Sequence, residues 1–76
     1  MWKKYRKKSV VVEAYQWFWD MGGTDEVQYY PSKNKHQIHT LNGPVEITSG
    51  EWVVKGVAGE IYPCRADIFA TTYEAV

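Results

Sequence analysis

The pattern of apolar and polar positions is clearest in residues 50–63, where it predicts a β-hairpin. A glycine that can adopt positive φ opens this segment, and strand-forming residues with one large aromatic follow it. Gly56 and Gly59 bracket a turn, after which Ile61 and Tyr62 begin the returning strand. We expect the other strands to pack around this hairpin.

The first long apolar run predicts a strand over residues 9–17. Valines and aromatic residues dominate it, and polar residues enter only in its second half. We therefore expect burial on both faces early in the strand and on one face later. A helix is disfavoured, because consecutive valines lose side-chain entropy in a helix and no capping box precedes them.

The middle of the chain predicts one short strand and a second hairpin. Val27–Tyr30 has strand character. Residues 36–41 lead into Asn42-Gly43, the pair favoured in a type I′ turn, and residues 44–47 return. Pro44 has no N–H and is expected beside the turn or on an edge. A further turn is expected at residues 48–51.

Residues 18–35 form the least regular region. Two adjacent glycines and three acids at residues 20–26 predict a loop, and residues 31–35 predict a second one. Long loops in compact domains often carry binding residues, so this region is the first place to look for a ligand contact.

The end of the chain predicts one helical turn near residues 64–69, of α or 3₁₀ type, and a last strand at residues 71–74. Strands joined by short turns make a meander. The fold class is therefore all-β: a small curved antiparallel sheet or partly open β-barrel of about six short strands.

The 76 residues give room for a single domain, and they include four Trp, six Tyr and two Phe. So small an interior cannot absorb every ring. We expect an aromatic surface that faces a ligand or another copy of the chain, and hence a homo-oligomer.

The formal net charge is zero, but the first eight residues carry five basic residues and no acid. This divides the chain into a basic leader (1–8) and a single β domain (9–76) that carries four basic and nine acidic residues. The leader either contacts phosphate groups or is a solvated arm that protects the next strand from edge-to-edge pairing.

The single cysteine, Cys64, cannot form an internal disulfide and fits a reducing compartment. No apolar run is long enough for a signal peptide or a membrane span.

Two blocks of sequence resemble a known family. They are K-Y-R-K-K-S-V-V-V-E-A-Y-Q-W at residues 4–17 and G-E-W-V-V-K-G-V-A-G-E-I-Y-P-C-R-A-D-I-F at residues 50–69, followed by T-Y-E at 72–74. The chain thus resembles small, uncharacterised phage and prophage proteins that read K-Y-R-K-K-P-V-V-V-E-A-x-Q-W and G-D-W-I-I-K-G-V-x-G-E-x-Y-P-C-K-P-D-I-F. Ser9 and Ala66 replace prolines and Glu51 replaces an aspartate. The resemblance implies a phage origin and action in the cytoplasm of the infected bacterial host.

Residues with catalytic or metal-binding chemistry are few. His36 and His39 stand three apart in a predicted strand and should point to opposite faces, which favours structural or surface roles over a shared metal ion. Cys64 lies beside Arg65, a neighbour that would lower the pKa of a thiol, but only the two histidines offer a base. We therefore favour a buried structural cysteine over a catalytic thiol.

Four carboxylates flank the central hairpin, and two of them could act as a general acid and base or all could be solvated turn positions: Glu46, Glu51, Glu60 and Asp67. The turn at residues 56–59 lacks the lysine and the following helix of a phosphate loop.

Aromatic and basic residues together form a predicted nucleotide-binding set, because rings stack on bases while Arg and Lys hold phosphates. The set is Arg6, Lys8, Trp17, Trp19, Trp52, Lys55, Tyr62 and Arg65. The alternative is that most of these rings are core.

These observations favour a small, phage-encoded, non-catalytic binding protein. We expect an inhibitor of bacterial host defence that sequesters a nucleotide signal or occludes a host protein. A nucleic-acid-binding module using the basic leader is the alternative, and a small hydrolase is the second alternative. No cofactor is expected.

Overall fold

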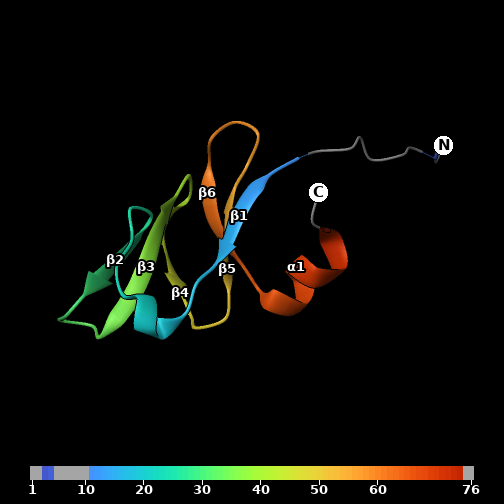
Figure 1. Ribbon diagram of the computed structural model, residues 1–76. Coiled ribbons are helices and arrows are strands. Elements are labelled where there is room, and N and C mark those ends of the chain that lie inside the picture. Colours follow the sequence, from blue (N-terminus) through green and yellow to red (C-terminus); the bar gives the residue numbers. More distant parts are fainter. Residues whose placement is uncertain (1–2, 5–10, 75–76) are drawn as a thin grey trace.

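The computed structural model describes residues 3–4 and 11–74 (Figure 1). In the described residues the chain forms six short strands, one 3₁₀ turn and one helix. In order these are β1 (Glu13–Gln16), η1 (Trp19–Met21), β2 (Val27–Tyr30), β3 (Lys35–Thr40), β4 (Gly43–Ile47), β5 (Trp52–Lys55), β6 (Ile61–Cys64) and α1 (Ala66–Thr72). The predicted all-β class is confirmed.

The strands form two antiparallel sheets of three, in the orders β1-β5-β6 and β2-β3-β4. The predicted central hairpin is confirmed, since β5 pairs with β6 with Trp52 opposite Cys64 and Lys55 opposite Ile61. Gly50, at φ 94°, opens it in the left-handed region that favours glycine. The two sheets lie against each other without closing into a barrel within the described part of the chain (Figure 1).

The first strand differs from its prediction. Only Glu13–Gln16 is a strand among the described residues of the segment 9–17, and Val11 is exposed rather than buried. Ser9 and Val10 lie outside the described residues. Because β1 pairs with β5 instead of its neighbour in sequence, one continuous meander is also wrong. Strands β2, β3 and β4 form a three-strand meander, and β5 and β6 form a separate hairpin.

The predicted second hairpin is confirmed in its pairing and wrong in its turn type. Thr40 lies opposite Gly43, so Leu41 and Asn42 make the turn. A type I′ turn needs positive φ at both positions, yet among the described non-glycine residues only Asn34 has positive φ. The residue with positive φ is instead Gly43, at 103°, which directly follows the two-residue turn. Lys35, expected in a loop, already belongs to β3.

The core lies between the two sheets and is built around Trp17. Its other fully or nearly buried members come from both sheets: Val27, Ile38, Ile47 and Val53, with Tyr15 and Ile61 packed against them. Burying aromatic and branched side chains at about 25 cal/mol per Å² of apolar surface is the main stabilising contribution in a domain of this size.

The helical turn predicted near residues 64–69 is confirmed as the start of a longer helix, whereas the strand predicted at residues 71–74 is wrong. The helix α1 has seven residues rather than one turn, and it includes Thr71 and Thr72, which were expected in a strand. Phe69 stacks on Trp52 with 4.1 Å between ring centroids and 6° between planes. This packing against β5 overrides the β preference of the threonines. The helix lies on the opposite side of the β1-β5-β6 sheet from the other sheet (Figure 1).

Candidate functional site

Four large apolar side chains lie exposed between the end of β1 and the middle of β2. They are 43–55 % exposed and are called the apolar surface from here on: Phe18, Trp19, Met21 and Tyr29. Three of them come from η1 and the residue before it, and the fourth comes from β2. Trp19 and Tyr29 both contact His36, and exposed large apolar side chains on a small domain are typical of interaction sites.

The buried residue His36 packs against two members of the apolar surface, Trp19 and Tyr29. It is 5 % exposed, and its imidazole lies 4.9 Å from the ring of Trp19 and 4.8 Å from those of Tyr29 and Trp17. Its Nδ1 atom is buried and forms no hydrogen bond with the described residues. One buried polar side chain thus contacts both exposed rings and the central core ring.

Backbone and side-chain hydrogen bonds fix the turn that presents the apolar surface. The Trp19 amide donates to Ser49 Oγ at 2.9 Å, and the indole N–H of Trp17 donates to the Gly22 carbonyl at 3.0 Å. Gly22 closes η1 at φ 64° and donates to the Trp19 carbonyl. These contacts hold Trp19 in place before any partner binds.

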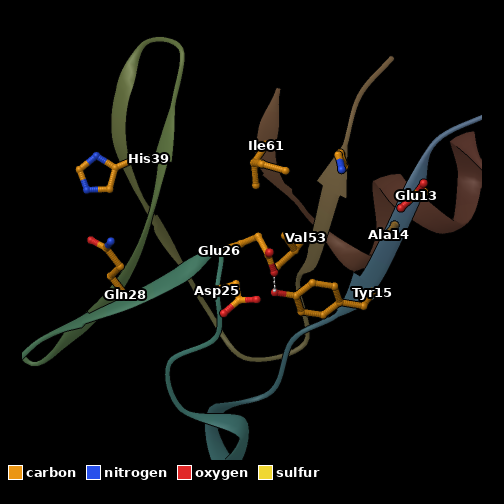
Figure 2. Close-up of a pocket in the computed structure, with 10 residues that line it drawn as sticks. Glu13, Ala14, Tyr15, Asp25, Glu26, Gln28, His39, Val53 and Ile61 are labelled. Carbon is orange, nitrogen blue, oxygen red and sulfur yellow. Dashed lines mark hydrogen bonds between the residues drawn. The ribbon is translucent and has the colours of Figure 1, made fainter. Parts of the chain in front are cut away.

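A groove of about 580 Å³ is lined by residues of both sheets and shares no lining residue with the apolar surface. Alternation along a strand places Tyr29 and His36 on one face and Gln28 and His39 on the other. In Figure 2 the Tyr15 hydroxyl points toward Glu26 and Asp25, while Gln28 and His39 lie on the β2-β3 side of the groove. The phenol of Tyr15 donates to Glu26 Oε1 at 2.6 Å.

The described members of the predicted nucleotide-binding set do not lie together. Arg6 and Lys8 lie outside the described residues. Trp17 is fully buried in the core, Trp19 belongs to the apolar surface, and Lys55 lines the groove. The remaining members lie at or beside α1.

Those remaining members have partners within the fold. Trp52 stacks on Phe69, and the hydroxyl of Tyr62 lies 3.4 Å from that of Tyr73. Arg65 is exposed and forms an ion pair of 3.0 Å with Asp67.

The predicted catalytic candidates are separated as well. His36 is buried while His39 is exposed and lies 2.9 Å from the Tyr30 hydroxyl, so opposite faces are confirmed. Cys64 is half-buried, and burial followed by the charges of Glu51 and Asp67 raises the pKa of its thiol. The expectation that Arg65 lowers this pKa was wrong.

The carboxylates that flank the hairpin have structural partners. Glu51 accepts from the Thr48 amide and Glu60 from the Ala58 amide, both in turns. Glu46 forms an ion pair of 3.7 Å with Lys35. No group of three or more potential metal ligands occurs among the described residues.

Loop character in the sequence pointed to the region 18–35, but not to Phe18, Met21 and Tyr29 as individual residues. Tyr15 and Glu26 were also missed, and they meet only because β1 lies beside the segment that precedes β2. No spacing rule links residues brought together by tertiary packing alone.

The comparisons add no relative: neither a family model, nor a curated protein, nor a solved structure matches this chain. Across residues 3–4 and 11–74, no helix has the length and apolar character needed to cross a membrane.

Proposed function

We propose that this chain is a small, phage-encoded, non-catalytic protein that inhibits a bacterial host defence by occluding a host protein in the cytoplasm of the infected cell. The observation that carries the proposal is the apolar surface with Trp19 at 55 % and Tyr29 at 45 % exposure over one buried histidine. The resemblance to small phage proteins supports the part of the proposal that concerns phage origin and the infected bacterial cell.

The composition of the apolar surface supports protein binding. Trp, Tyr, Phe and Met are enriched in the cores of protein interfaces, and Trp and Tyr dominate the binding energy when they are desolvated. The backbone of Trp19 is held by the hydrogen bond from its amide to Ser49 Oγ, and its indole is held by contact with His36. Ordering such a side chain beforehand reduces the entropy lost on binding.

Charge favours a protein partner over a nucleotide. The described basic residues of the predicted nucleotide-binding set do not converge, since Lys55 lines the groove and Arg65 is paired with Asp67. The groove itself contains three carboxylates against one lysine, a balance that repels phosphate. Homo-oligomerisation and binding of nucleic acid by the basic leader remain predictions from the sequence.

The functional test is phage plating on bacterial strains that each carry one defence system. We expect the wild-type chain to restore plating on at least one strain and the variant with Trp19→Ser and Tyr29→Ser to lose this effect. Val57→Ser with Ile68→Ser is the matched control, because both side chains are exposed and lie away from the apolar surface. Equal restoration by the first variant, or none by the wild type on any strain, contradicts the proposal.

Sedimentation of the purified chain separates a host partner from a second copy. If copies of the chain cover this surface, the mass of the wild type rises with concentration and that of the doubly substituted variant does not. That result would assign the surface to self-association and overturn the proposal.

A further inference from the structure

The groove lined by both sheets is not part of the apolar surface. Its volume of about 580 Å³ lies within the range of small-molecule sites, roughly 300 to 1,000 Å³. It is built by β1, the segment before β2, the faces of β2 and β3, and the β5-β6 hairpin. Both sheets contribute, so folding forms the groove.

The groove has an apolar floor and an acidic rim. Val53 is buried and Ile61 half-buried on the floor, and the half-buried Tyr15 ring lies beside them. Glu13, Asp25 and Glu26 carry three negative charges around it.

Little positive charge balances this rim. The only lysine of the lining is Lys55, which lies opposite Glu13 in the β1-β5 register. Both ion pairs formed among the described residues lie elsewhere, on Lys35 and Arg65. Within residues 3–4 and 11–74, no ion pair engages the carboxylates of the rim.

Tyr15 organises the acidic end of the groove. Its hydroxyl donates to Glu26 Oε1 and lies 2.7 Å from Thr24 Oγ1, which leaves the second carboxylate oxygen of Glu26 uncommitted within the described residues. Burial, and then the hydrogen bond to Glu26, raises the pKa of this phenol, so it stays a neutral donor. An aromatic ring beside carboxylates is a favourable environment for an organic cation.

We infer that the groove binds an organic cation, a primary ammonium or guanidinium head on a short aliphatic stem. The head lies against Glu26 and Asp25 beside the Tyr15 ring, and the stem covers Val53 and Ile61. Such a head is available from a free alkylamine or from a lysine or arginine side chain. This site shares no lining residue with the apolar surface.

The experiment is a titration of the full isotopically labelled chain followed by NMR. The probes are n-butylammonium and n-butylguanidinium, with n-butanol as the neutral analogue and calcium chloride as a control for general cation binding. Capped single lysine and arginine residues test the side-chain source. We expect saturable shifts centred on Tyr15, Gln28 and Ile61 with the organic cations alone.

Variants locate the site. Glu26→Gln and Asp25→Asn should each weaken cation binding about tenfold or more, the usual effect of losing a charged hydrogen-bond partner. Glu46→Gln, an exposed carboxylate outside the groove, should leave the affinity unchanged, as should the doubly substituted apolar-surface variant. Saturation by the alkyl cations alone identifies a small-molecule site, and saturation by the capped residues identifies a peptide site.

Three results would overturn the inference: no saturable shift, equal binding of n-butanol or calcium, or equal weakening by Glu46→Gln. Unchanged thermal unfolding of Glu26→Gln and Asp25→Asn ensures that a loss of binding reports the groove and not the fold. Failure here leaves the plating experiment on the apolar surface unaffected.

Discussion

Trp19 stands edge-on to His36, with 4.9 Å between ring centroids and 80° between ring planes. One ring is more than half exposed and the other is buried. The contact joins the exposed indole to the core, because the same imidazole also touches Trp17 at 4.8 Å. The apolar surface is therefore an outward extension of the core.

The two tryptophans that contact His36 should differ strongly in their effect on stability. Trp17→Ala removes a fully buried ring and its hydrogen bond to Gly22, and should lower the free energy of unfolding by about 3–5 kcal/mol. Trp19→Ala should cost about 1 kcal/mol, since over half of its side chain already contacts water. Urea unfolding of both variants measures the difference, and equal losses would contradict this placement.

Replacing His36 should stabilise the protein. Its Nδ1 atom is buried without a partner among the described residues, and such a group costs about 1–3 kcal/mol. His36→Phe keeps a flat ring between Trp17, Trp19 and Tyr29, so we expect a gain of about 1 kcal/mol in chemical denaturation. His39→Phe, at an exposed position, should change the stability by less than about 0.5 kcal/mol. A loss of stability in His36→Phe would show that the imidazole is needed for its polarity.

The helix α1 should depend on a single stacked pair. Seven residues are too few for an independent helix in water, so Phe69→Ala should release the helix from Trp52. Hydrogen exchange of the amides in residues 66–72 should then accelerate. Ile68→Ala, at a half-exposed neighbouring position, serves as the control and should leave exchange nearly unchanged. Equal effects of the two substitutions would argue against stacking as the anchor.

Stability should fall at high pH through Tyr62. The hydrogen bond with Tyr73, followed by burial, raises the pKa of Tyr62 from 10.0 to about 12. The folded state therefore holds this proton more tightly than the unfolded state. The resulting stabilisation is complete below pH 10 and is lost as the pH rises from 10 to about 12. Denaturation at stepped pH should show this loss in the wild type and a smaller one in Tyr73→Phe. The same pH dependence in both would contradict the assignment.

Cys64 should react slowly with alkylating agents at neutral pH. Burial and the charges of Glu51 and Asp67 raise the pKa of its thiol, and the thiolate is the reacting form. The folded chain should therefore react with iodoacetamide more slowly than the urea-unfolded chain, and Asp67→Asn should react faster than wild type. A folded chain that reacts faster than the unfolded one would instead favour the hydrolase alternative.

Local patterns in the sequence were sufficient to predict the two hairpins and the all-β fold class. The turn bracketed by Gly56 and Gly59 predicted the pairing of β5 with β6, and Asn42-Gly43 predicted that of β3 with β4, because hairpin pairing depends on neighbours in sequence. The pairing of β1 with β5 is non-local and has no sequence signature. The threonines of α1 were misassigned for a related reason, since packing of Phe69 on Trp52 overrides their local preference.

The candidate sites were predictable only as regions. Composition indicated more rings than a small core can hold, and loop character pointed to residues 18–35. Which rings stay exposed depends on the position of His36, buried between Trp17 and the exposed Trp19 and Tyr29. The groove needs both sheets in place, so the sequence alone does not reveal Tyr15 beside Glu26.

Photo-cross-linking from position 19 tests the central claim most directly. A chain with p-benzoylphenylalanine in place of Trp19, expressed in cells that carry a defence system it inhibits, should form one discrete adduct with a protein of that system. The same probe in place of Ile68, an exposed position on α1, should form none. An adduct from position 68 and not from 19, or adducts of the chain with itself alone, would contradict occlusion of a host protein by the apolar surface.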